Sequence, residues 1–149
     1  MLNVSFNYLQ GRVPNPLNVA PYADVDLSSN LFEGEKVPFL FQMKPMTGEI
    51  PASIGEMLLL LQVIDLSRNN ISGNIPSSIW NYSFLKVLDL AYNNLSGEIL
   101  ASLGQLRQLQ SLHLNDNKLT GNIPLSFQNL STLATLDLGN NRFSGHIPL

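Results

Sequence analysis

The chain has 149 residues, no cysteine, a formal net charge of -3 and a sequence pI near 5.2. A negative net charge gives no electrostatic attraction to nucleic acid or to an anionic membrane surface, so neither is expected as a partner of this segment. The longest apolar run is MLLLL at 57–61, far shorter than the roughly 20 residues that span a bilayer. The N-terminus lacks the basic, apolar and small-residue regions of a signal peptide.

The N-terminal part of the chain shows a period with one damaged unit. VSFNYLQGRVP supplies Asn7, and VDLSSNLFEGEKVP supplies Asn30 and Gly34, so that the two asparagines lie one repeat apart. The next glycine of this kind, Gly48, follows Gly34 too soon for a complete unit, and Lys44 stands where an asparagine is expected. About ten residues of a normal unit are missing. We therefore expect an irregular or deleted repeat at about 35–62, without regular strand pairing over 35–45; a deletion is favoured over a natural irregular loop.

From position 64 onward one motif recurs four times at a constant interval. The copies are IDLSRNNISGNIP, LDLAYNNLSGEIL, LHLNDNKLTGNIP and LDLGNNRFSGHIP, and their shared asparagine falls at positions 69, 93, 117 and 141. A fixed period of this length with regularly spaced leucines predicts a solenoid, and the Leu-x-Leu alternation predicts one short strand in each coil. The leucines of successive coils then stack into a continuous core, while the alternate residues of each strand face solvent.

An asparagine follows each predicted strand, where the chain must turn sharply. A buried amide must find hydrogen-bond partners, and so must the N–H and C=O groups of the turn. We expect these side chains to form a ladder along the solenoid, made by Asn7, Asn30, Asn69, Asn93, Asn117 and Asn141, with Lys44 pointing to solvent instead. The Gly-x-Ile-Pro that follows suits a turn and then an extended return path over the convex side.

The motif L-x-x-L-x-L-x-x-N-x-L-x-G-x-I-P, as in NNLSGEI and NKLTGNIP, resembles the plant extracellular class of leucine-rich repeats. This class forms the ectodomains of receptor-like proteins and receptor-like kinases, and the defence-related receptor-like proteins are most similar. The resemblance implies an α/β repeat fold over 1–149, a single solenoid of about six repeats. It also implies a parallel sheet on the concave face, a mostly irregular or 3-10 convex side, and recognition of a protein or peptide ligand and of a co-receptor ectodomain.

The resemblance further implies a location on the extracellular side of the plasma membrane, in a parent receptor that acts in defence or developmental signalling. Such ectodomains carry cysteine-paired caps and a transmembrane helix, which this chain lacks, so we expect a fragment of a longer receptor. Two alternatives remain: a secreted protein similar to polygalacturonase inhibitors, and a truncated receptor product without a function of its own.

The concave face is the expected place of any binding site. Among the alternate positions taken as solvent-facing are Ser67, Ala91 and Asn115, and one row across the strands is made by Asp65, Asp89, His113 and Asp137. An open surface of this kind has no pocket to exclude water, so we expect no catalytic residue, metal site or cofactor. Aromatic and arginine residues dominate binding hot spots. The predicted ligand-binding residues are Arg68, Lys86, Tyr92, His113 and Asp116.

Five Asn-X-Ser sequons are candidates for N-glycosylation in a secreted protein. They begin at Asn3, Asn70, Asn81, Asn94 and Asn129. Asn70 and Asn94 belong to the repeat motif itself, whereas Asn81 and Asn129 lie on the predicted return path and are the better candidates.

Overall fold

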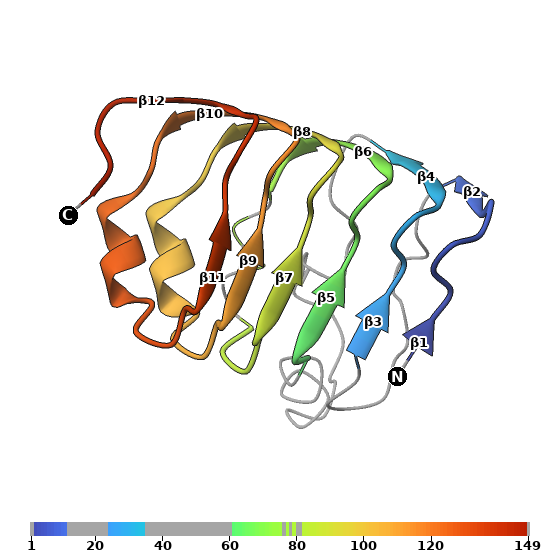
Figure 1. The fold of residues 1–149 in the computed structure, drawn as a ribbon, viewed down its shortest axis with the longest axis horizontal. Coiled ribbons are helices and arrows are strands. Elements are labelled where there is room, and N and C mark those ends of the chain that lie inside the picture. Colours follow the sequence, from blue (N-terminus) through green and yellow to red (C-terminus); the bar gives the residue numbers. More distant parts are fainter. Residues whose placement is uncertain are drawn as a thin grey trace, which may run out of the picture.

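The structure is a computed structural model that describes residues 2–11, 24–34, 61–75, 77, 79 and 82–148. Its first sheet is parallel and has six strands, which lie side by side in one layer in the order β1-β3-β5-β7-β9-β11 (Figure 1). The strands are β1 (Leu2–Asn3), β3 (Asp24–Asp26), β5 (Val63–Asp65), β7 (Val87–Asp89), β9 (Ser111–His113) and β11 (Thr135–Asp137). This is the sheet expected for the concave face, and the predicted leucine-rich solenoid fold is confirmed.

A second parallel sheet runs along the first one, in the order β12-β10-β8-β6-β4-β2. Its strands are β2 (Gln10–Gly11), β4 (Leu31–Gly34), β6 (Asn70–Asn74), β8 (Asn94–Glu98), β10 (Lys118–Asn122) and β12 (Arg142–Ser144). The sequence did not predict this sheet, since it indicated only a mostly irregular path after the turn. The segments pair because they are extended and recur at the same interval in every coil, which brings their backbone groups within hydrogen-bonding distance of each other.

The spacing along the chain between paired strands is constant in the C-terminal coils and longer between β3 and β5. Val63 pairs with Val87, and Val87 pairs with Ser111 at the same interval along the chain. Val25, however, pairs with Ile64, and the stretch between these two is more than half as long again as a normal coil. Strand β5 is therefore the direct neighbour of β3, although the two are separated by more than one normal repeat of sequence. Lys44 and the stretch 35–45, for which no regular pairing was expected, lie outside the described residues.

The core is a stack of apolar side chains that point inward from both sheets. Leu88 and Leu112 lie opposite each other in the register of β7 and β9, and both are completely buried. Leu95 and Leu119 extend the core from the second sheet and are likewise buried. A single coil could not enclose this surface alone, so each coil depends on its neighbours for a core.

Five of the six predicted ladder asparagines bond to two coils, whereas Asn7 is exposed and, among the described residues, its amide donates to Val4 O and Ser5 O of its own coil. The Asn93 amide Nδ2 donates to Leu66 O at 2.9 Å in the preceding coil and to Leu90 O at 3.1 Å in its own coil. The Asn93 Oδ1 atom accepts the Ile71 N–H at 3.0 Å. The same pattern is present at Asn30, Asn69, Asn117 and Asn141. Each of these side chains therefore joins two successive coils.

Two 3-10 helices lie side by side on the return path of the C-terminal coils (Figure 1). They are η3 (Ala101–Gln105) and η4 (Leu125–Asn129), and their short length agrees with the predicted 3-10 convex side. Gly104 allows them to approach closely, because a Cβ atom at this position would lie 2.6 Å from the Ser126 carbonyl oxygen. In the part of the chain that the structure describes, no helix is long and apolar enough to cross a membrane.

We expect Gly104→Ala to lower the free energy of unfolding by roughly 1–3 kcal/mol, because the added methyl group overpacks the contact between η3 and η4. Urea unfolding followed by circular dichroism measures this difference. The matched control is Gln105→Ala in the same helix, at an exposed position, which should change stability by less than about 0.5 kcal/mol. Equal effects of the two substitutions would show that the close approach at Gly104 does not limit packing.

Candidate ligand-binding surface

A row of polar side chains crosses the first sheet at one register position. We call it the acidic row: Asn3, Asp26, Asp65, Asp89, His113 and Asp137, each paired with the next in the parallel register. Adjacent strands of a sheet lie about 4.8 Å apart, so these side chains are close neighbours. Asp26 and Asn3 extend the predicted row by two coils. The sequence Val-Asp-Leu at 25–27 matches the motif of the later coils and is the signal that could have identified Asp26.

The carboxylates of this row stabilise the turns that follow the strands. Asp65 Oδ1 accepts the Ser67 N–H at 2.9 Å, and Asp89 Oδ1 accepts the Ala91 N–H at 3.0 Å. The same bond is made at Asn3, Asp26 and Asp137. Such a side-chain bond to the N–H two residues on is an Asx-turn. The recurring aspartate therefore has a structural role in each of the coils that carry it.

The turn also corrects one expectation about exposure. Ser67, Ala91 and Asn115 were predicted to face solvent as alternate strand residues, but all three are buried. The period-2 alternation ends at the last strand residue, because the chain turns there and the second residue after it points inward. An Asx-turn accompanies this bend at Asp65 and Asp89, and Asn115 is buried at the same position after His113. Strand alternation therefore predicts exposure only as far as the last strand residue.

His113 is the exception in the acidic row. It lies between Asp89 and Asp137 in the register of the sheet, and its Nε2 atom is 2.7 Å from the Ser111 hydroxyl on the same strand. Among the described residues, no group of three or more His, Cys, Asp and Glu side chains is arranged to hold a metal ion.

Asp89 is held in a less polar environment than an ordinary aspartate. Burial raises the pKa of its carboxyl, and the charge of Asp65 raises it further. The hydrogen bond from the Ala91 N–H lowers this pKa, as do the charges of His113 and Arg68, without cancelling the effect of burial. An ionised Asp89 therefore costs the folded state some stability at neutral pH.

We expect Asp89→Asn to increase the free energy of unfolding at neutral pH, because an asparagine Oδ1 can keep the bond to Ala91 without the buried charge. The increase should shrink as the pH falls through the raised folded-state pKa of Asp89. It should vanish below the unfolded-state pKa of about 3.9, where both states of the parent protein are protonated. Urea unfolding of parent and variant over this pH range measures the difference, and a difference independent of pH would contradict the assignment.

A second set of side chains lies at the residue before each ladder asparagine. These residues have left-handed backbone conformations, with φ of 54° at Arg68, 56° at Tyr92, 54° at Asp116 and 50° at Asn140. Residues other than glycine adopt such angles rarely. They recur here because the chain must reverse direction in every coil before the buried asparagine. The side chains at this position therefore lie in a line beyond the C-terminal ends of the strands of the first sheet.

Four of these side chains contact each other in pairs, and we call them the rim network: Arg68, Tyr92, Asp116 and Asn140. The Arg68 guanidinium carbon lies 4.3 Å from the centre of the Tyr92 ring, within the range of a cation–π interaction. The Asn140 amide donates a hydrogen bond to Asp116 Oδ1, and the Asn115 amide donates to Asp116 Oδ2 at 2.8 Å. These contacts join two pairs of successive coils, the first through Arg68 and Tyr92 and the second through Asp116 and Asn140.

The rim network keeps its carboxylate ionised. Hydrogen bonds from Asn140 and Asn115 lower the pKa of Asp116, and smaller contributions in the same direction come from a hydrogen bond of Tyr92 and from the charge of Arg68. Tyr92 is held on one face of its ring by the Arg68 guanidinium. Its side chain remains 44% exposed. An aromatic group held in this way loses little conformational entropy when a partner binds.

The structure brings together three of the five predicted ligand-binding residues, since Arg68, Tyr92 and Asp116 are neighbours in the rim network. His113 is not part of the rim network and belongs to the acidic row, where it pairs with Asp89. Lys86 directly precedes β7, whereas Tyr92 follows that strand. Lys86 is therefore at the N-terminal ends of the strands, opposite to the rim network. The sequence analysis did not select Asn140 and Asn115. Asn140 stands one repeat after Asp116, and this constant interval is the sequence signal that could have identified it.

Four of the five predicted sequons are described by the structure, and Asn81 lies outside the described residues. Asn3 belongs to the acidic row, where its amide donates to Asp26 at 2.8 Å. Asn94 donates its amide to Asn70 across the second sheet. Asn129 ends η4 and is exposed.

Comparison with known proteins agrees with this geometry. A leucine rich repeat family model matches residues 60–119, and a second leucine-rich repeat model matches residues 132–149. Together they cover more than half of the chain, which belongs to the leucine-rich repeat family. No curated protein sequence matches the chain significantly.

Solved structures of plant receptors are similar to the whole chain. The plant peptide hormone receptor RGFR1, in complex with RGF2, is 36% identical, with a TM-score of 0.77 over 95% of this chain and 20% of the receptor chain. PEPR1 with AtPEP1 is 34% identical, with a TM-score of 0.81 over 97% of this chain and 18% of that one. The Arabidopsis receptor kinase HAESA, in complex with the peptide hormone IDA and the co-receptor SERK1, is 34% identical, with a TM-score of 0.72 over 98% of this chain and 26% of that one. This chain therefore spans about a fifth to a quarter of the length of these three receptor chains.

Proposed function

We propose that this chain is a ligand- or partner-binding segment of a plant cell-surface receptor-like protein, on the extracellular side of the plasma membrane, acting in defence or developmental signalling. The observation that carries the proposal is the rim network, in which an exposed aromatic residue, Tyr92, is stacked with Arg68 of the preceding coil. Rigid aromatic and arginine side chains are the usual anchors of protein and peptide interfaces. The partners are a peptide or protein ligand and a co-receptor ectodomain.

The similar structures support this proposal, since RGFR1 is a plant peptide hormone receptor in complex with RGF2, and HAESA is in complex with the peptide hormone IDA and the co-receptor SERK1. The arrangement of the acidic row supports binding over catalysis, because its carboxylates each bond to a backbone N–H of the following turn. We accordingly propose no catalytic residue and no cofactor. Asn129 is the proposed glycosylation site among the described sequons, since its side chain is exposed and lies away from the rim network.

Titration calorimetry of the purified chain tests the proposed function. The probes are synthetic RGF2, AtPEP1 and IDA peptides and the SERK1 ectodomain, with scrambled peptides of the same composition as controls. We expect saturable binding of at least one authentic probe and none of the scrambled peptides. Absence of binding by all four authentic probes, or equal binding of authentic and scrambled peptides, would contradict the proposal.

A further inference from the structure

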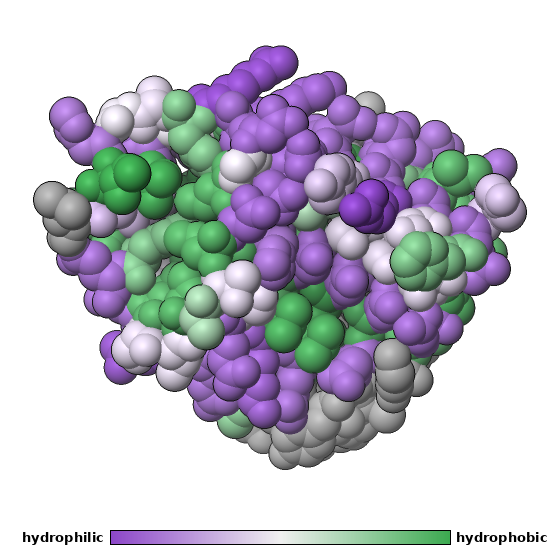
Figure 2. Space-filling view, viewed as in Figure 1, coloured by the Kyte–Doolittle hydropathy of each residue, from purple (hydrophilic) through white to green (hydrophobic). Residues whose placement is uncertain are grey.

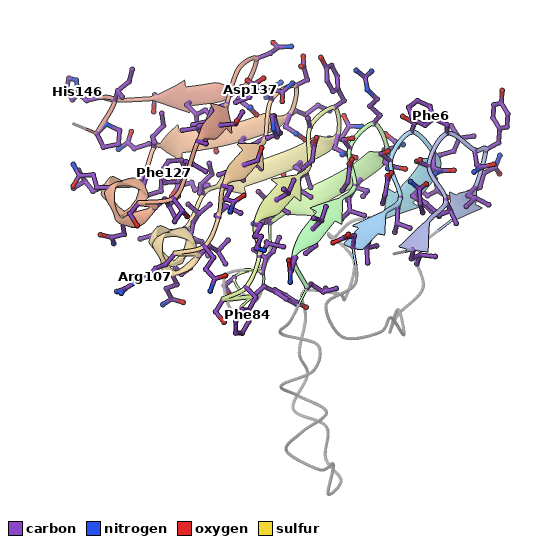
Figure 3. All side chains as sticks on the ribbon, turned by 60° about the horizontal axis from the view of Figure 1, so that its bottom comes forward. Phe6, Phe84, Arg107, Phe127, Asp137 and His146 are labelled. Atoms are coloured by element: carbon purple, nitrogen blue, oxygen red, sulfur yellow. The ribbon has the colours of Figure 1, made fainter. Side chains whose placement is uncertain are left out.

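In five of the six described coils, a backbone N–H donates to the side chain two residues before it. The acceptors lie at 2.9 to 3.0 Å, and they are Asn3, Asp26, Asp65, Asp89 and Asp137. All five belong to the acidic row, whose last described member, Asp137, is labelled in Figure 3. In each of these coils the N–H therefore points to the face of the first sheet that carries the acidic row.

The coil that contains β9 is the exception. Its residue in the acidic row is His113, and the Nε2 atom of this residue lies 2.7 Å from the hydroxyl of Ser111, two residues earlier on the same strand. Since residues two apart lie on one face of a strand, the ring leans back along β9, away from the turn that follows. The Asn115 N–H is equivalent to the bonded N–H groups of Ala91 and Gly139, but it has no hydrogen-bond partner among the described residues.

The carbonyl and the side-chain amide of Asn115 are paired, in contrast to its backbone N–H. The carbonyl accepts the Tyr92 N–H at 3.0 Å, and the amide donates to Asp116 Oδ2 at 2.8 Å, so this N–H lies next to two members of the rim network. Asn115 is only 9% exposed, and the polar groups of such buried residues almost always have partners. A donor with little access to water gives up little hydration when an acceptor arrives, so it gains more from that acceptor than an exposed donor would.

The charges around the Asn115 N–H select an uncharged acceptor. In the register of the sheet His113 stands between Asp89 and Asp137, and Asp116 directly follows Asn115. These three carboxylates would repel a carboxylate or a phosphate of a ligand, whereas an amide carbonyl carries no net charge. Figure 2 shows mainly hydrophilic residues above the strands of the first sheet, where the chain turns toward the second sheet. A ligand on this surface is therefore fixed by hydrogen bonds more than by apolar burial.

We propose that the Asn115 N–H is a ligand-binding donor, which takes an amide carbonyl oxygen of the peptide ligand. This inference rests on the proposed function, because it names one contact of the same ligand with the same surface. The bound carbonyl occupies the place that a side-chain oxygen of the acidic row occupies in the five other coils. His113 has a positioning role, because its ring bonds to Ser111 and leaves the donor free. The peptide is thereby held at the turn after β9, beside Tyr92.

Two substitutions of His113 test this contact. Asparagine can accept the N–H two residues on, as Asn3 does from Ser5 at 3.0 Å, so His113→Asn should pair the Asn115 N–H within the chain. His113→Leu introduces a side chain of similar size without an acceptor and is the matched control. In thermal unfolding followed by circular dichroism, His113→Asn should melt about 2–4 °C above His113→Leu. In calorimetry with whichever of the RGF2, AtPEP1 and IDA peptides binds the parent chain, His113→Asn should bind about 10-fold more weakly than His113→Leu.

Amide hydrogen exchange followed by NMR observes the donor directly. In the free parent chain the Asn115 N–H should exchange faster than the bonded Ala91 N–H, and the bound peptide should slow it; in His113→Asn it should be slow without peptide. Equal peptide affinity of the two variants, or an Asn115 N–H as slow as that of Ala91 in the free parent chain, would overturn this inference and leave the proposed function intact. Binding of the SERK1 ectodomain without binding of any peptide would do the same. Absence of binding by every probe would contradict both proposals.

Discussion

Asn93→Leu is expected to lower the free energy of unfolding by about 3 kcal/mol, the largest stability effect of any single substitution considered. The asparagine is 8% exposed and bonds to backbone groups in two coils. A leucine of similar size leaves the Ile71 N–H buried without a partner, which costs roughly 1–3 kcal/mol. It also removes one of the two hydrogen bonds to the Leu66 carbonyl, which keeps the bond from Asn69. Urea unfolding followed by circular dichroism measures the change, and an unchanged m-value establishes that the unfolding transition remains comparable.

Two matched substitutions separate the ladder from general effects of losing an asparagine. Asn94→Leu changes the adjacent residue, whose amide bonds to the side chain of Asn70, and should alter stability by less than about 0.5 kcal/mol. Asn7→Leu removes a ladder residue that is exposed and bonds only within its own coil, so its cost should be well below that of Asn93→Leu. Equal costs for Asn7 and Asn93 would show that the contact between coils is not the source of the stabilisation.

Tyr92→Ala is expected to weaken binding of whichever peptide or co-receptor probe associates with the chain by about 10- to 100-fold, as for a central anchor of an interface. Arg68→Ala should have a smaller effect of the same sign. Because the guanidinium stacks on the ring, the effects of the two substitutions should not add, and a double-mutant cycle by calorimetry measures their coupling. Tyr92→Phe keeps the ring under Arg68 and should retain most of the affinity.

The control for this prediction is Asn129→Gln at the end of η4, which should leave affinity unchanged and remove a glycan if one is attached. Lys86→Ala tests a second predicted ligand contact. Lys86 lies at the N-terminal end of β7, whereas Tyr92 follows the C-terminal end of that strand. Its effect should add to that of Tyr92→Ala. Loss of binding in Asn129→Gln, with full affinity in Tyr92→Ala, would place the binding surface on the convex side instead.

The repeat pattern predicted those parts of the fold that one coil can specify alone. Leu88 and Leu90 alternate around Asp89, and this local pattern is enough to predict a strand with a buried face. Asn93 and Gly97 have equivalents at a constant interval because each coil needs the same turn, so one copy of the motif predicts the others. The second sheet could not be predicted in this way, because its short segments become strands only when their neighbours lie beside them.

By itself the sequence determined the coil length, the asparagine ladder and the leucine core, since each of these is written in local residue types at a constant spacing. The tertiary structure alone decided that β3 lies directly beside β5, that Tyr92 stands between Arg68 and Asp116, and that Lys86 lies at the far edge. Those outcomes depend on how one coil is placed on the next and on the direction in which each turn sends its side chain. Contacts between different coils set that placement, and the pattern within one repeat predicts the ladder bonds but not which coil becomes the neighbour or where a surface side chain is directed.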